Sequence, residues 1–168
     1  GKYWRIPTYG KLYKIIDYGR AIYSFKEKEM ISDCFFKTGD AAGQYNFSIF
    51  KNKNKSELKP NFGFDLCRLA CSLYDYFISD IQENKNNPAA KLIDEWVKDD
   101  NGKNLLYKAN GEERYPDFKL YKMITRKSTM HTPENQLKNP IFKQFISSRK
   151  KIGKKSPIIN IDNIPRYF

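Results

Sequence analysis

The feature that most constrains the fold is the run from Phe64 to Ile78, which reads FDLCRLACSLYDYFI. Its apolar residues cover most of the circumference of a helix, and its main polar interruptions are Arg68, Ser72 and Asp75. A helix that is apolar on nearly all sides is buried among other elements. Asp65 stands at its start, where a carboxylate suits the partly positive end of a helix. The run therefore predicts a buried central helix at 64–78.

The elements expected around this helix are a hairpin before it and several helices after it. Short aromatic and β-branched runs on either side of Thr8–Lys11 predict an N-terminal β-hairpin over 3–16. Residues 17–61 lack a sustained periodicity and predict a long, mostly irregular segment, and segments of this kind are usually functional or mobile. Amphipathic patterns and prolines in first turns predict further helices within 89–146, at 89–98, at 118–127 and from Pro133. This order predicts an α+β domain that is mainly α-helical.

The chain is strongly basic, with a formal net charge of +12 over 168 residues. Such a charge favours polyanionic partners such as nucleic acid, nucleotide or anionic lipid. Much of the excess lies in residues 147–168, which predict a basic tail after a folded domain over 1–146. We expect the tail either to be simply solvated or to make a weak contact with nucleic acid.

Other bulk properties bear on the surroundings of the protein. No apolar run reaches the length of roughly 18–20 residues that spans a bilayer. The three cysteines provide no disulfide framework, which indicates a reducing compartment. We therefore expect no membrane span and an intracellular, cytoplasmic location.

A short motif near the N-terminus, Asp17-Tyr18-Gly19, follows two isoleucines. Asp and Gly are ordinary turn residues, so the motif is compatible with a plain turn between strands. A carboxylate fixed at a strand end is equally suited to Mg²⁺, which prefers oxygen ligands, and Gly19 would let the turn tighten. The residues alone leave both interpretations open.

Taken together, this motif and the helix that opens at Asp65 resemble the C-terminal portion of a protein kinase-like domain. Asp17-Tyr18-Gly19 is similar to the family's Asp-Phe-Gly motif, with Tyr18 in place of Phe. The stretch from Asp65 to Asp75 resembles the family's buried central helix, with Ala70 in the place usually held by Gly. The resemblance covers roughly 12–146 and extends to the divergent kinase-like proteins of large DNA viruses, for which host cytoplasm or virion is the implied location.

The resemblance implies that the intact protein transfers the γ-phosphoryl group of ATP to a Ser/Thr hydroxyl of a protein substrate. It implies that Asp17 ligates Mg²⁺, that Tyr18 and Gly19 belong to the nucleotide site, and that Asp65 gives structural support to the catalytic loop. Residues 17–61 would be the activation and substrate-binding segment. The 168 residues contain no Gly-rich loop, Val-Ala-Ile-Lys strand or His-Arg-Asp loop. The implied partners are therefore an upstream N-lobe and catalytic loop, and the chain alone is expected to be inactive.

Two other classes of function remain open, a non-catalytic kinase-like interaction domain and a basic nucleic-acid-binding module. The signatures of RRM, KH and zinc-finger domains are missing from the sequence, which weakens the second. Cys67 and Cys71 have a spacing that can bind metal, but with no second Cys or His pair their core packing is the better interpretation. His131, the single histidine, indicates a helix start or a surface position.

Overall fold

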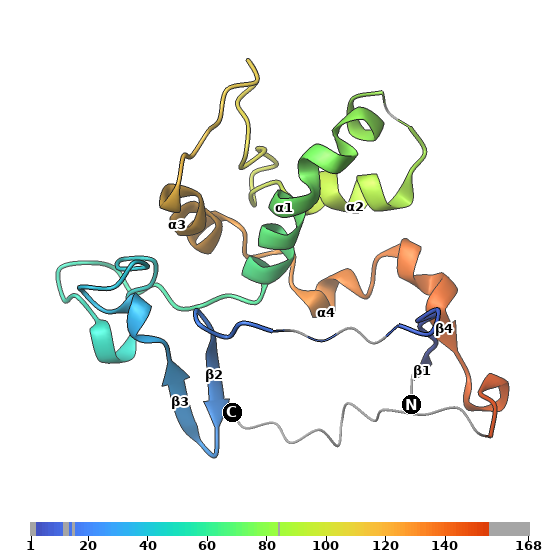
Figure 1. Ribbon diagram of the computed structural model, residues 1–168, viewed down its shortest axis with the longest axis horizontal. Coiled ribbons are helices and arrows are strands. Elements are labelled where there is room, and N and C mark those ends of the chain that lie inside the picture. Colours follow the sequence, from blue (N-terminus) through green and yellow to red (C-terminus); the bar gives the residue numbers. More distant parts are fainter. Residues whose placement is uncertain (1–2, 12–13, 15, 84, 155–168) are drawn as a thin grey trace. The chain divides into compact units, whose positions relative to one another are not determined.

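The computed structural model of the protein describes residues 3–11, 14, 16–83 and 85–154 (Figure 1). These residues form two compact units: Asp33–Leu137 make up the larger one, and the described residues on either side make up the smaller one. The described residues are mixed α+β with about 39% helix, which confirms the α+β class but does not support the kinase-like C-lobe that the resemblance implies. The limits predicted for domain and tail, at 146 and 147, do not coincide with this division. They stay a prediction, because residues 155–168 lie outside the described residues.

The smaller unit contains two separate pairs of antiparallel strands. β1 (Tyr3–Trp4) pairs with β4 (Ile146–Ser147), and β2 (Ile22–Phe25) pairs with β3 (Lys28–Ile31). The strand that pairs with β1 in the described residues comes from near the other end of the chain, and the hairpin expected over 3–16 stays a prediction. The expected turn is present, since Lys11 N–H donates to the Thr8 carbonyl at 2.9 Å. Residues 12, 13 and 15 of the expected second strand lie outside the described residues.

The hairpin of β2 and β3 lies within the segment that was expected to be irregular. Its two turn residues, Lys26 and Glu27, have φ values of 48° and 63°. Left-handed conformations at both central positions give the tight turn whose twist matches paired strands. Asn and Gly usually occupy such positions, so Lys-Glu gave no sign of a hairpin.

The larger unit is built on helices. It comprises η1 (Asp33–Phe35), η2 (Ser48–Phe50), α1 (Gly63–Gln82), α2 (Pro88–Trp96), α3 (Phe118–Lys127) and α4 (Pro133–Gln136). α1 packs against α2 and α3 (Figure 1). Local signals start α2, because the Asn87 side chain accepts hydrogen bonds from two backbone N–H groups and Pro88 occupies the first turn. None of the described helices is long and apolar enough to cross a bilayer.

The burial of α1 differs from the prediction. The helix buries one stripe, formed by Gly63, Cys67, Ala70 and Tyr74. Phe64 and Cys71 are half-buried beside this stripe, but other apolar side chains face solvent, with Leu69 48% and Tyr76 84% exposed. The expectation of a helix buried on nearly all sides was therefore wrong, because α2 and α3 cover one side of it. Gly63 is required at this interface, since a Cβ there would lie 2.7 Å from the Ser128 carbonyl oxygen.

The core of the larger unit sits under this stripe. Cys67, Leu105 and Ile124 are fully buried, and half-buried side chains that include Cys71 and Tyr115 pack around them. A hydrogen bond with Cys67, together with burial, raises the pKa of the Cys71 thiol, which favours the neutral form. This placement agrees with the expectation that the two cysteines are core residues.

Candidate functional site

The motif Asp17-Tyr18-Gly19 forms an exposed turn in the smaller unit. Asp17 has a left-handed φ of 63°, and its Oδ1 accepts a hydrogen bond from Gly19 N–H at 3.2 Å. Ala21 N–H donates to the Tyr18 carbonyl at 2.9 Å, which closes the turn. Tyr18 itself is 62% exposed. The left-handed φ of this turn therefore lies at Asp17 and not at Gly19, the residue that was expected to let the turn tighten.

The metal-binding role of Asp17 stays a prediction. Across the described ranges, no group of three or more His, Cys, Asp or Glu side chains is arranged to hold a metal ion. Asp65 belongs to the larger unit, in the first turn of α1, and makes no side-chain cap there. Burial raises the pKa of its carboxyl group. His131 lies just before the start of α4, one of the two positions expected for it. Its Nδ1 is 3.7 Å from the Glu95 carboxylate.

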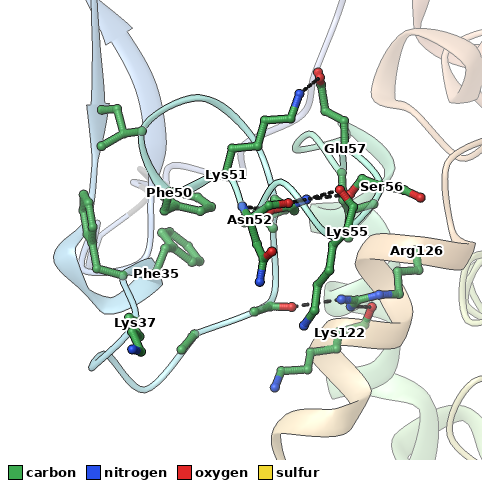
Figure 2. Close-up of a pocket in the computed structure, with 17 residues that line it drawn as sticks. Phe35, Lys37, Phe50, Lys51, Asn52, Lys55, Ser56, Glu57, Lys122 and Arg126 are labelled. Carbon is green, nitrogen blue, oxygen red and sulfur yellow. Dashed lines mark hydrogen bonds and ion pairs between the residues drawn. The ribbon is translucent and has the colours of Figure 1, made fainter.

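The larger unit has a pocket of about 1160 Å³ between the segment 35–58 and one face of α3, shown in Figure 2. We call it the basic pocket. Its lining includes part of a cluster of five aromatic rings, Phe35, Phe36, Tyr45, Phe47 and Phe50, of which all but Phe47 line the pocket. Neighbouring rings meet edge to face, with centroids 5.1 Å apart for Phe35–Tyr45 and for Phe47–Phe50. These contacts stiffen an otherwise irregular segment, which forms the floor of the pocket.

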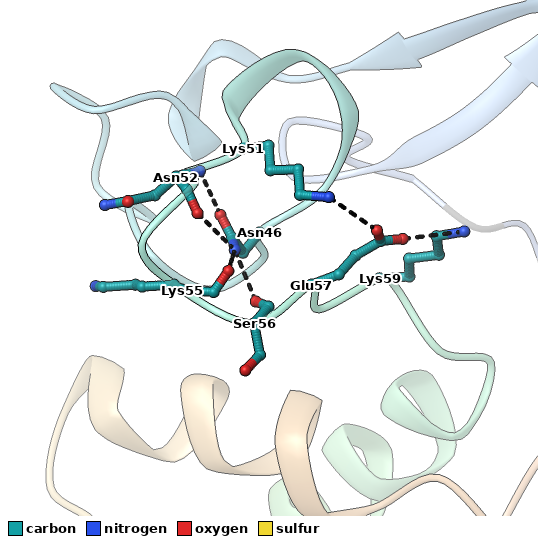
Figure 3. A network of polar contacts seen from close by, with 7 residues as sticks. All are labelled: Asn46, Lys51, Asn52, Lys55, Ser56, Glu57 and Lys59. Carbon is teal, nitrogen blue, oxygen red and sulfur yellow. Dashed lines mark hydrogen bonds and ion pairs between the residues drawn. The ribbon is translucent and has the colours of Figure 1, made fainter.

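Asn46 holds the far wall of the basic pocket in place (Figure 3). Its side-chain amide donates to the carbonyls of Asn52, Lys55 and Ser56 at 3.3, 3.0 and 2.7 Å. Its Oδ1 accepts from Asn52 N–H, and its backbone pairs with Leu58 in an antiparallel bridge. One buried side chain thus closes the loop of residues 46–58, because it satisfies backbone groups at several points along it.

Hydrogen bonds tie the floor of the basic pocket to α3. Arg126 donates from Nη2 to the Gly43 carbonyl at 2.9 Å and from Nη1 to the Lys122 carbonyl at 2.7 Å. Gly43 has a φ of 75°, which suits glycine. Below them, Gln44 Nε2 donates to Thr125 Oγ1 at 3.2 Å in a buried contact. These bonds hold the guanidinium group of Arg126 at the mouth of the pocket while its charge stays unpaired with any carboxylate of the described chain.

The lining of the basic pocket carries five cations and one carboxylate. The cations are Lys37, Lys51, Lys55, Lys122 and Arg126. Glu57, the carboxylate, pairs with Lys51 at 3.2 Å and with Lys59, outside the pocket, at 3.1 Å. Hydrogen bonds from Lys59 and Lys51 lower the pKa of the Glu57 carboxyl. No ion pair among the described residues involves the other four cations, so the pocket keeps a surplus of positive charge.

Sequence reasoning missed this pocket, because it treated residues 17–61 as a mostly irregular segment and did not connect them with 118–127. The signal present in the sequence was the density of aromatic residues, followed by lysines, between Phe35 and Lys59. No family model, curated protein or solved structure matches the chain.

Proposed function

We propose that the larger unit binds a phosphate-bearing ligand in the basic pocket. The observation that carries this proposal is the convergence of Lys37, Lys55, Lys122 and Arg126 on one pocket without a carboxylate to neutralise them. Cations gathered in a concave site focus the field and attract anions.

The four cations suit phosphate in different ways. Arg126 is held by two backbone carbonyls, so its remaining N–H donors are oriented before a ligand arrives. The lysines carry compact charges on flexible stems and adjust to the oxygens of the anion. Charge-assisted hydrogen bonds from such donors to phosphate are among the stronger polar contacts that proteins make.

The size of the basic pocket indicates more than a bare phosphate. Its volume of about 1160 Å³ lies somewhat above the roughly 300–1,000 Å³ that is usual for small-molecule sites. Phe36 and Phe50 are half-buried rings on its wall, with centroids 5.8 Å apart. The ligand therefore has room for an organic body beside its phosphate group.

The test is calorimetric titration of the full chain with inorganic pyrophosphate and with a mononucleotide, without divalent cations. Removing one phosphate contact should weaken binding by about tenfold, so Lys55→Ala and Lys122→Ala should each have this effect. Lys103→Ala is the matched control, because Lys103 is an exposed lysine of the same unit outside the pocket. Equal affinities for all three variants would remove the basis of the proposal.

A second candidate is phosphotransfer by a kinase-like protein. The observation that favours it is that the basic pocket lies mainly within 17–61, the segment to which the family resemblance assigns activation and substrate binding. In this function the phosphate-bearing ligand would be a phosphorylated side chain, and the exposed Asp17 carboxylate would ligate Mg²⁺. ATP binding would require an N-lobe and a catalytic loop that the 168 residues do not contain.

Thermal shift with Mg²⁺ and ATP tests this candidate, on a protein that carries the upstream lobe. Stabilisation should require Mg²⁺ and disappear in Asp17→Asn. Asp33→Asn, which changes another exposed aspartate of the same segment, should leave it intact. Identical responses of the two variants would show that Asp17 does not ligate Mg²⁺ and that Asp17-Tyr18-Gly19 is only a turn.

A further inference from the structure

Glu57 already plays the part of an anion at the edge of the basic pocket. Its Oε2 lies 3.2 Å from Lys51 Nζ, and its Oε1 lies 3.1 Å from Lys59 Nζ, so one carboxylate bridges two ammonium groups (Figure 3). Lys51 lines the pocket whereas Lys59 does not. The bridge therefore marks a second position for an anion, which is separate from the position between the four unpaired cations. This second position extends beyond the pocket, because Lys59 lies outside the lining.

We propose that Lys51 and Lys59 form a second phosphate subsite, which the Glu57 carboxylate fills until a ligand displaces it, and that the ligand is single-stranded nucleic acid. This inference rests on the proposed function of the basic pocket and names the class of ligand.

Displacement of Glu57 is feasible because the contacts it gives up are weak. The side chains of Lys51, Lys59 and Glu57 are 46%, 71% and 43% exposed. Ion pairs this accessible contribute little to stability, since water solvates the separated charges almost as well. A phosphate that takes the place of the carboxylate keeps the same two donors, and Glu57 returns to water.

Two anion positions favour a ligand with several phosphates. A phosphorylated side chain offers one phosphate and would fill the pocket alone, whereas a nucleic acid strand carries a charge on every nucleotide. The half-buried rings of Phe36 and Phe50 offer faces on which a base can stack. A duplex groove instead admits a helix or a two-stranded ribbon, and the wall here is an irregular loop.

The first experiment measures the binding of a fluorescent twelve-nucleotide oligothymidylate to the full chain over a range of salt concentrations. The logarithm of affinity falls with the logarithm of salt by about 0.7 for each phosphate that a protein contacts on a single strand. Lys59→Ala should therefore reduce this slope by about 0.7 and leave pyrophosphate binding unchanged. Lys103→Ala, the control lysine, should not change the slope.

The second experiment removes the competing carboxylate. Glu57→Gln should tighten oligothymidylate binding by about threefold to fivefold, as expected for release of two exposed ion pairs. Glu112→Gln is the matched control, because Glu112 pairs with Lys108 at 2.8 Å, is also exposed (64%, against 43% for Glu57), and its substitution causes the same change in net charge. A tightening shared by both variants would be a general effect of charge.

The outcomes separate the two levels of the proposal. If pyrophosphate binds in the basic pocket but Lys59→Ala leaves the oligothymidylate slope unchanged, the second subsite is refuted and the proposed function stands. A duplex or a phosphopeptide that binds more tightly than the oligothymidylate overturns the named ligand. If neither pyrophosphate nor oligothymidylate binds, both proposals fail together.

Discussion

The substitution Asn46→Asp should strongly destabilise the larger unit, although the two side chains have nearly the same shape, because the contacts of Asn46 need its N–H donors. The amide nitrogen of Asn46 lies 3.3, 3.0 and 2.7 Å from three carbonyl oxygens, and the side chain is buried. An aspartate would replace both N–H donors by an oxygen that faces these carbonyls. Two hydrogens serve the three acceptors, so about two net hydrogen bonds of ~1 kcal/mol each are lost.

A loss of about 2 kcal/mol should lower the melting temperature of a unit of this size by roughly 8–16 °C. Thermal unfolding followed by circular dichroism measures this shift. Amide exchange of Asn52 and Leu58 should also accelerate, because their N–H groups bond to the Asn46 side chain and to its carbonyl oxygen.

The effect should depend on pH. Facing carbonyl oxygens, the new carboxyl would have a raised pKa in the folded state, so the folded protein would hold its proton at higher pH than the unfolded chain. The destabilisation should therefore grow as pH rises above the ordinary Asp value of about 3.9 and shrink below it.

Asn52→Asp is the matched control in the same loop. The Asn52 side chain accepts one hydrogen bond, from Asn54 N–H at 2.9 Å, and an aspartate keeps that acceptor. Its melting temperature should stay within a few degrees of the wild type. If the two variants unfold at the same temperature, Asn46 does not hold the loop and the account of the far wall of the pocket is wrong.

Three further changes test other parts of the chain. Asn87→Ala should cost about 1 kcal/mol in thermal unfolding, because it removes the cap of α2, whereas Asn86→Ala should not. Partial desolvation raises the pKa of the Asp65 carboxyl, which is still exposed, so its ionisation above about 3.8 costs a little stability; Asp65→Asn should melt slightly higher than the wild type at pH 7 and alike at pH 3. Deleting 149–168 should reduce salt-sensitive oligothymidylate binding but not pyrophosphate binding, and it spares the β1–β4 pair, which ends at Ser147.

The helices of the larger unit were predictable from the sequence, because their signals are local. The pattern over 118–127 predicted α3 with the bounds that the structure shows, and the proline at 133 predicted the start of α4. α1 was predicted at 64–78 and extends from Gly63 to Gln82. Its exposure was not predictable, since apolar periodicity says how many sides of a helix are apolar but not how many neighbours cover them.

Features that join distant residues escaped prediction. Nothing near Tyr3 indicates that its strand partner is Ser147. The basic pocket depends in the same way on contacts between Gly43 and Arg126 and between Gln44 and Thr125, which no local pattern encodes. The role of Asn46 was not predictable either, because nothing in the sequence distinguishes a buried asparagine that closes a loop from the solvated asparagines around it.

The net charge of the chain predicts the kind of partner but does not locate the site that binds it. A surplus of +12 indicates anionic partners but does not say which cations are unpaired: Lys98 lies 2.6 Å from Asp94 and Lys108 lies 2.8 Å from Glu112, whereas other lysines have no such partner among the described residues. Binding depends on charge that is both unpaired and fixed in position. The basic pocket meets both conditions, because its rings and the Asn46 loop hold it in shape while Lys55 and Lys122 lack carboxylate partners within the described chain. For this reason a few substitutions in the pocket should change phosphate binding more than the removal of an equal charge elsewhere.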